Sequence, residues 1–189
     1  METLLGIAAG IGLSAACGFR VFVPLLMINL AAISGHLHLA SGFEWIGNYY
    51  ATMAFATATI IEVLAYYIPW LDNILDTITS PLAIVAGLVA TASVVTDLSP
   101  ALKWTLAIIA GGGIAGIVQG ATTAIRTKSS LLTAGLGNHL FSTFELSGSL
   151  ITALLAIIFP IVCIVLIIVF CIFAICITGR YFFRRTKTT

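Results

Sequence analysis

Long apolar runs separated by few charged positions dominate the pattern of this chain. The uncharged intervals long enough to hold membrane segments are 3–19, 21–43, 45–61, 77–96, 104–125, 129–144 and 146–179. A helix that spans a bilayer needs about 20 predominantly apolar residues. Segments 80–97 and 104–125 therefore predict one crossing each. The segment from Trp45 to Ile68, with aromatic residues near both ends, predicts another.

Two apolar segments contain helix-breaking residues and predict broken helices. Gly18-Phe19-Arg20 interrupts the first 34 residues, which predicts two short helices that meet near Arg20 as a re-entrant hairpin. An unbroken helix over the 34 residues of 146–179 would measure about 51 Å. Pro160 inside it predicts either a kink or two shorter helices. The stretch 70–79, acidic on one face and apolar on the other, predicts a short interfacial helix.

Composition excludes most classes of soluble protein. Hydrophobic residues make up 60% of the 189-residue chain and charged residues 8%, against roughly 45–50% and about 25% in a typical soluble domain. A globule of this size has too little interior to bury that much apolar surface. We therefore expect an all-α polytopic transmembrane bundle, a single membrane domain over residues 1–189 that lies in the lipid bilayer. The formal net charge of +1 gives no electrostatic footprint for nucleic acid.

Motifs of catalysis are missing from the sequence. It contains no Walker motif, no HExxH and no nucleophile elbow, so neither an enzyme nor a cofactor is expected. The four cysteines lie in apolar runs without CxxC spacing and are expected to be buried thiols. Residues 180–189 form a basic tail. By the positive-inside rule, this tail predicts a cytoplasmic C-terminus.

An internal duplication is indicated first by small residues and arginines. A ladder of small residues at every fourth position covers 6–18 and recurs 106 residues later over 112–124. In both copies an arginine follows two residues after the ladder, as Arg20 and Arg126. Such ladders let helix backbones approach closely, either within one bundle or across a dimer.

A second pair of segments supports the duplication. Residues 38–44 and 139–145 agree at five of seven positions, including the histidine and the glutamate. We therefore expect two degenerate repeats, 4–97 and 104–179. We favour an inverted arrangement with a substrate site between them.

The two arginines are the first candidates for a binding site. An arginine in a membrane segment costs at least about 2.5 kcal/mol on insertion scales, so it usually faces the bundle interior with a partner. The planar guanidinium suits oxyanions, and a broken helix offers free N–H groups beside it. Arg20 and Arg126 therefore predict a site for an anionic small molecule or a lipid-phosphate headgroup. A structural ion pair or a snorkelling side chain is the alternative for each.

Glu44 and Glu145 are the natural partners of these arginines. Pairing is conceivable within a copy or across copies, as Arg20 with Glu145 and Arg126 with Glu44. An exchange of partners would couple substrate or proton binding to a conformational change. The alternative is that each glutamate begins a long apolar helix, where a negative charge suits the helix dipole.

His38 and His139 complete the candidate set, because each lies six residues before one of those glutamates. Histidine relays protons near neutral pH, and two His–Glu sets have ligands that suit a divalent metal. Polar loop residues at the interface are the alternative. For Glu62 the sequence leaves open a bundle-facing acid or one that reaches the interface, and Asp76 is expected in water at a segment end.

Several short strings resemble a known family. They are Gly18-Phe19-Arg20 with Pro24, Pro69-Trp70-Leu71-Asp72, and Ser80-Pro81. Together they resemble a bacterial membrane family, domain of unknown function 4126, over nearly the whole chain. The resemblance implies a multi-pass protein of the bacterial inner membrane and no established activity. By fold-level analogy, the broken arginine-bearing segments are also similar to those of small lipid-phosphate flippases with paired re-entrant hairpins.

These features predict a small membrane transporter or flippase for an anionic solute or lipid headgroup. Arg20 and Arg126 would bind the anion, and the glutamates would carry coupling protons with histidine support. One alternative is a divalent-metal or ion channel that uses the His/Glu sets. Another is a non-transporting scaffold that assembles through the glycine ladders. A homodimer is one way for so small a protein to enclose a path.

Overall fold

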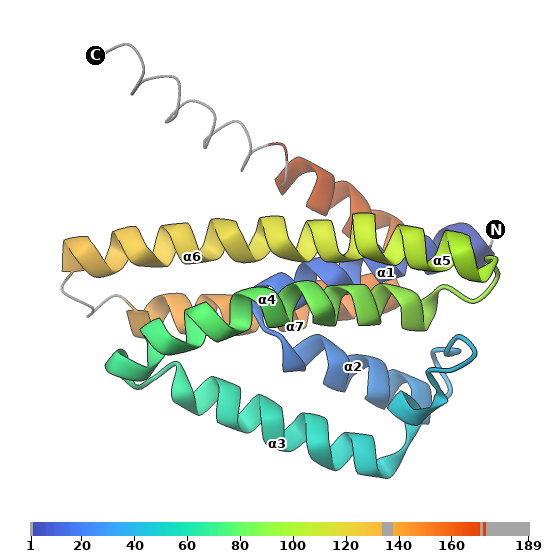
Figure 1. The fold of residues 1–189 in the computed structure, drawn as a ribbon, viewed down its shortest axis with the longest axis horizontal. Helices are drawn as coiled ribbons and strands as arrows, with labels where there is room; N and C mark the ends of the chain where they lie inside the picture. Colours follow the sequence, from blue (N-terminus) through green and yellow to red (C-terminus); the bar gives the residue numbers. More distant parts are fainter. Residues whose placement is uncertain (1, 134–137, 171, 173–189) are drawn as a thin grey trace.

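The computed structural model describes residues 2–133, 138–170 and 172, and these form helices joined by short turns. The labelled helices are α1 (Glu2–Phe19), α2 (Phe22–Ile33), α3 (Tyr49–Ala65), α4 (Pro69–Val94), α5 (Pro100–Leu106), α6 (Gly113–Thr133) and α7 (Asn138–Ile158). A further helix covers Pro160–Phe170. Helices α5 and α6 form one continuous rod through a π-helix over Ala107–Gly112, and the other consecutive helices run back and forth along one axis (Figure 1). The described ranges contain no strand, which confirms the all-α prediction.

Helix α1 lies at the centre of the bundle, against α4, α6 and α7. Its small residues make this possible. A Cβ atom on Gly10 would lie 3.1 Å from the Thr91 side chain, and one on Gly18 would lie 2.6 Å from the Cβ of Val118. The Thr91 hydroxyl also donates a hydrogen bond to the Gly10 carbonyl at 3.0 Å. The first small-residue ladder therefore packs helices closely, as such ladders do in membranes.

The direction of the helices departs from the inverted arrangement that we favoured. Along both arginine-bearing segments, residues later in the chain contact earlier residues of α4. In the first segment, Gly6 lies against Val94 and Gly10 against Thr91. In the second, Gly111 lies against Thr91 and Gly87, Gly112 lies against Ile84, and Arg126 pairs with Asp76. Helices α1 and α6 are thus both antiparallel to α4 and run in the same direction (Figure 1). The second ladder also packs less closely, since a Cβ on Gly120 would have no neighbour within 4 Å.

Three stretches are long and apolar enough to cross a membrane: Ile74–Val94, Pro100–Thr127 and Leu140–Ile158. Large apolar side chains point outward along them, as at Ile109 and Phe144, which are 70% and 73% exposed. The interior holds mainly small residues and several polar groups. Apolar side chains outside and polar groups inside are typical of helices in lipid. The chain therefore has the character of a multi-pass membrane protein.

Two predicted elements differ from the structure. The segment predicted to cross from Trp45 to Ile68 becomes a 3-10 turn followed by α3, which has only 17 residues, because Asn48 caps the helix by accepting the Ala51 N–H at 2.8 Å. The predicted interfacial helix over 70–79 is not separate, since α4 continues from it to Val94 with Pro81 inside. A proline removes one intrahelical hydrogen bond, and the packing of α4 against its neighbours keeps the helix in one piece.

Both predicted breaks are present. Helix α1 ends at Phe19 and α2 begins at Phe22, so Arg20 lies in the turn between two short helices. Helix α7 ends at Ile158, and the next helix begins at Pro160, where a proline is tolerated in the first turn. The described part of the segment 146–179 therefore forms two helices and not one unbroken helix. The basic tail, residues 180–189, lies outside the described residues.

Candidate functional site: a buried arginine cluster

The turn between α1 and α2 holds Arg20 inside the bundle. Glu62, near the end of α3, accepts hydrogen bonds from the backbone N–H groups of Val21 at 2.8 Å and Phe22 at 3.1 Å. These amides belong to the start of α2, where no side chain caps the helix locally. A carboxylate at a helix N-terminus satisfies its free amides and its positive dipole end. Glu62 thereby fixes the turn, and the Arg20 side chain is only 1% exposed.

Arg20 is held by α7 and by an aromatic ring. Its Nη2 atom donates to the hydroxyl of Ser142 at 2.6 Å and to the carbonyl of the same residue at 3.1 Å. The same atom lies 3.5 Å from a carboxylate oxygen of Glu145. Its guanidinium carbon lies 3.8 Å from the centre of the Tyr66 ring, which is a cation–π arrangement. The predicted ion pair between Arg20 and Glu145 is therefore present.

Arg126, on α6, approaches the same ring and the same carboxylate. Its Nη1 atom donates to Asp76 at 2.6 Å, and its Nη2 atom pairs with Glu145. Its guanidinium carbon lies 4.5 Å from the centre of the Tyr66 ring. Two guanidinium groups thus share one aromatic ring and one glutamate.

We call Arg20, Glu62, Tyr66, Asp76, Arg126 and Glu145 the arginine cluster. Except for Asp76, whose side chain is 14% exposed, each member is at most 6% exposed. The Tyr66 hydroxyl ties the ring to α4, through Thr79 at 2.9 Å and Asp76 at 3.3 Å. Charges buried in this way are stable only when they are paired and hydrogen-bonded. The ion pairs and hydrogen bonds of the cluster therefore stabilise its charges inside the bundle.

Two nitrogen atoms of the Arg20 guanidinium find no hydrogen-bond acceptor among the residues that the structure describes. They are the buried Nε and Nη1 atoms, whereas Nη2 donates to Ser142. A guanidinium carries five N–H donors and no acceptor. Leaving a buried donor unpaired costs about 1–3 kcal/mol, so native proteins seldom do it without a reason. Arg20 therefore presents buried donors that the described residues leave without an acceptor.

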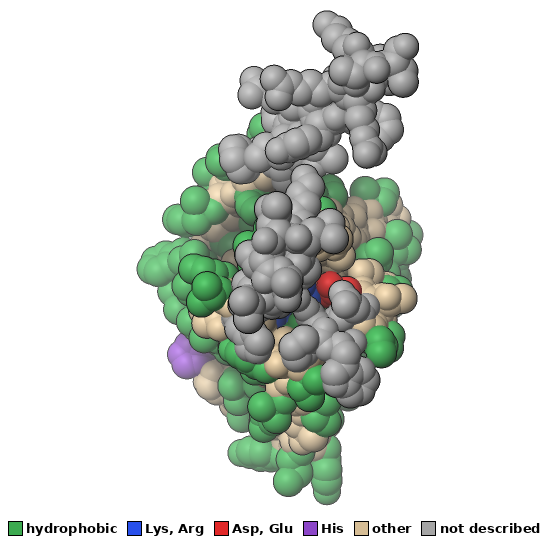
Figure 2. Space-filling view, turned by 90° about the vertical axis from the view of Figure 1, so that its left-hand side faces the viewer, with side chains coloured by type: hydrophobic (Ala, Val, Ile, Leu, Met, Phe, Trp, Pro, Cys, Tyr) green, Lys and Arg blue, Asp and Glu red, His purple; other side chains and the backbone are tan. Residues whose placement is uncertain are grey.

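The cluster lies toward one end of the three candidate spans, not at their middle. Asp76 is near the start of Ile74–Val94, Arg126 is near the end of Pro100–Thr127, and Glu145 is in the second turn of Leu140–Ile158. Seen from this end, acidic and basic side chains show near the centre, with hydrophobic side chains around them (Figure 2). This depth is closer to a membrane interface than to the midplane site that paired repeats commonly have.

The other predicted site residues lie elsewhere. Glu44 and His38 are exposed in the loop between α2 and α3, which contacts the far end of α4 through the Ala40 N–H and the Ser93 carbonyl. Ser93 is 17 residues from Asp76 on α4, a separation of about 25 Å along the helix. The predicted pair of Arg126 with Glu44 therefore does not form, because Arg126 meets Asp76 and Glu145 instead. The Glu44 carboxylate accepts the Gly42 N–H at 2.9 Å.

The second candidate histidine is His139, and its side chain lies outside the described part of the structure. Among the described residues, no group of three or more His, Cys, Asp or Glu side chains is arranged to hold a metal ion.

Sequence reasoning missed two members of the cluster, Asp76 and Tyr66, and the Ser142 hydroxyl that accepts from Arg20. Asp76 was expected in water, but it pairs with Arg126 because α4 is one helix that passes the end of α6. Tyr66 was assigned to an aromatic belt, but it is 4% exposed between the arginines. Ser142 carried no signal beyond its place in the repeated segment. For Glu62 the bundle-facing alternative is correct, and the signal was a lone acid in an apolar helix.

Comparison with known proteins identifies one family that the chain matches. Residues 7–180 match the model of the family described as Domain of unknown function (DUF4126), which confirms the resemblance seen in the sequence. No curated protein and no solved structure matches the chain.

Proposed function

The chain belongs to the family Domain of unknown function (DUF4126), and on this premise we propose, from its own residues, that it is a small membrane transporter or flippase for a ligand with an anionic group. One observation carries the proposal. Two buried guanidinium groups share the carboxylate of Glu145. Arg126 has Asp76 as a second partner, whereas Glu145 lies near only the Nη2 atom of Arg20, whose Nε and Nη1 atoms keep donors without an acceptor among the described residues. The oxygens of an anionic group would supply the acceptors that these two nitrogen atoms lack.

In this proposal Glu145 is the internal counter-ion that a ligand displaces. Oxygens of a phosphate or carboxylate accept hydrogen bonds from the free Nε and Nη1 atoms of Arg20, since a guanidinium fork matches such groups. The displaced Glu145 then takes up a proton, because an unpaired carboxylate in a dry interior is highly unfavourable. Ligand and proton therefore move together. The Tyr66 ring holds both guanidinium groups in place while their partners change.

The short helices support a re-entrant hairpin as part of the path. Helices α1 and α2 have 18 and 12 residues, fewer than the roughly 20 needed for a crossing. The chain starts beside the C-terminal end of α4, turns at Arg20, and returns to that end at Ala40. We propose that this hairpin lies in a bacterial inner membrane with the C-terminus cytoplasmic, as a monomer or a homodimer. No enzymatic step is part of the proposal.

Two alternatives from the sequence are less well supported. A divalent-metal or ion channel would use His38 and Glu44, and these lie in an exposed loop at the opposite end from the arginine cluster. A non-transporting scaffold would use the arginine cluster only to hold the bundle together. A scaffold gives no reason for the unpaired donors of Arg20, whereas a transporter uses them to bind its ligand. The unpaired donors therefore favour the transporter.

The test is transport by protein reconstituted in phosphatidylcholine vesicles. Two probes are followed, radioactive inorganic phosphate for uptake and a fluorescent phosphatidate for movement between leaflets. We expect the wild-type protein to accelerate at least one probe, Arg20→Gln to abolish this acceleration, and Lys103→Gln, which removes a cation at the far end of the bundle, to retain it. If neither probe is accelerated, or if Arg20→Gln matches the wild type, the transporter proposal is wrong and the scaffold is favoured.

A further inference from the structure

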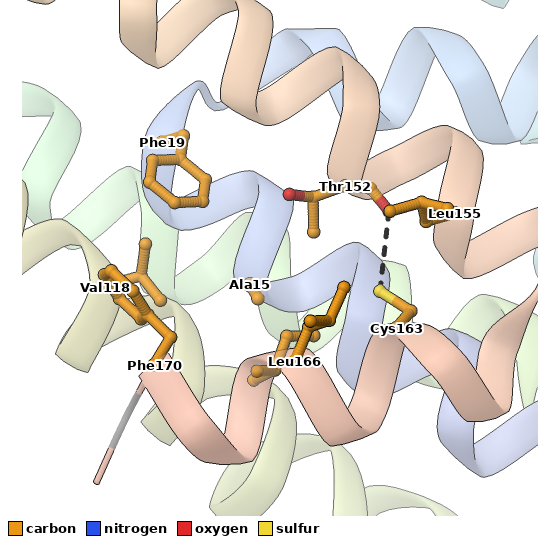
Figure 3. A pocket seen from close by; sticks show the side chains of 9 residues that line it. Ala15, Phe19, Val118, Thr152, Leu155, Cys163, Leu166 and Phe170 are labelled. Carbon is orange, nitrogen blue, oxygen red and sulfur yellow. Dashed lines mark hydrogen bonds between the residues drawn. The ribbon is translucent and has the colours of Figure 1, made fainter. Parts of the chain in front are cut away.

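An apolar cavity lies beside the arginine cluster. It has a volume of about 240 Å³, is open on one side, and is lined by α1, α6, α7 and the Pro160–Phe170 helix (Figure 3). Side chains that line it include those of Phe19, Val118, Thr152, Cys163, Leu166 and Phe170. The Cys163 thiol lies 3.6 Å from the Thr152 carbonyl, so this polar contact is internal to the wall. A cavity lined by apolar groups stays dry and takes hydrocarbon in preference to a polar solute.

The cavity and the cluster both involve α6, α7 and the end of α1. Phe19 directly precedes Arg20, Val118 lies 8 residues before Arg126, and Thr152 lies 7 residues after Glu145. Along α6 and α7 these separations correspond to about 10–12 Å. Phe19 lies between the two regions, because its ring packs on Gly148 and stands 6.1 Å from the Phe170 ring. The charged cluster and the apolar cavity therefore lie on either side of Phe19.

The far wall of the cavity borders the lipid-facing surface. Leu166 lines the cavity and is also 54% exposed. On a membrane protein such a surface is in contact with acyl chains, so the cavity opens toward hydrocarbon. A free anion has no apolar chain to place in this cavity, so the cavity would not raise its affinity.

Resting on the proposed function, we propose that the ligand of the arginine cluster is an anionic phospholipid, with its phosphate at Arg20 and an acyl chain in this cavity. The phosphate oxygens meet the unpaired donors, and the chain passes Phe19 to reach Thr152 and Cys163. A soluble anion would fill only the charged half. The chemical class is therefore a lipid with a phosphate headgroup and at least one chain.

The test measures binding of lysophosphatidates of increasing chain length to protein in phosphatidylcholine nanodiscs. Relative to the probe in water, each methylene buried in the cavity should raise the affinity by about fourfold, until the cavity is full. Thr152→Phe fills the cavity, so this variant should lose the dependence on chain length and retain binding of glycerol phosphate. The matched control is Ile151→Phe, whose side chain is 56% exposed on the same helix, and it should behave as the wild type. The wild type and the variants are compared with the same probe, so that partition of the probe into the nanodisc affects each measurement equally.

Different results separate the two proposals. If Thr152→Phe keeps the chain-length dependence of the wild type, or if inorganic phosphate binds as tightly as the longest lipid, the lipid inference is wrong while the anion site stands. If no anionic probe binds the wild type, the proposed function fails as well. Should Thr152→Phe not fold, a photoreactive group on the chain of lysophosphatidate is expected to label the Pro160–Phe170 peptide of the wild-type protein. Absence of this label would refute the inference.

Discussion

Glu145→Gln is the most informative single change in this protein. Glu145 pairs with Arg126 and lies 3.5 Å from Arg20, and it is 6% exposed. At an effective dielectric constant of about 20, unit charges at that distance attract by about 5 kcal/mol. The glutamine oxygen still accepts a hydrogen bond, so the net loss should match that for breaking a buried ion pair, about 3–5 kcal/mol. The melting midpoint should then fall by roughly 6 to 20 °C, at about 2–4 °C per kcal/mol for a chain of this length.

The assay is thermal unfolding of the purified protein in nanodiscs, followed by intrinsic fluorescence. Glu44→Gln is a close control, because it makes the same chemical change at the corresponding position of the first repeated segment. The Glu44 side chain is exposed in a loop, so its replacement should leave the midpoint within about 2 °C of the wild type. Equal shifts in the two variants would refute the reasoning, because they would mean that Glu145 does not balance the buried arginines.

The same variant distinguishes a ligand site from a purely structural network. In Glu145→Gln the two guanidinium groups lack their shared counter-ion, so an added anionic lipid should bind more tightly than to the wild type. A ligand that binds only the folded state stabilises it by an amount that rises with its affinity. Dioleoyl phosphatidate should therefore restore more of the midpoint in the variant than it adds to the wild type. No difference from dioleoyl phosphatidylcholine would count against an anion site.

Three further predictions concern packing and buried hydrogen bonds, all measured by the same unfolding assay. Gly111→Ala should destabilise by about 1–3 kcal/mol, because its Cβ would lie 2.6 Å from the Thr91 hydroxyl. Gly113→Ala, with nothing within 4 Å, should be neutral or stabilising, and a reversed order would contradict the packing. Asn29→Ala leaves the Ile46 and Asn48 carbonyls without their donor, so a loss of about 1–3 kcal/mol is expected. Glu62→Leu should cost at least as much as Asn29→Ala, because it frees two amides at the start of α2; a smaller loss would show that the turn is held by other contacts.

The class of this protein and the positions of its helix breaks follow from local features of the amino-acid sequence. Few charges, long apolar runs and low polarity require an all-α membrane bundle, because backbone polar groups in lipid must be satisfied within helices. The break at Arg20 and the break before Pro160 also follow from local residues, since a proline or a charged interruption acts within one or two turns. The presence of Arg20 and Arg126 in the interior followed from the high cost of placing an arginine against lipid.

Tertiary structure decided which charges meet. The two repeated segments carry the same histidine and glutamate, yet Glu145 lies between the arginines and Glu44 lies in a loop at the other end of the bundle. Asp76 and Tyr66 join the cluster because α4 passes antiparallel to α6 and α3 ends beside both. Such partners are set by the register and direction of helices far apart in the chain. Local pattern determines where a helix forms and which side chains avoid lipid, whereas long-range packing alone determines the neighbours that those side chains find.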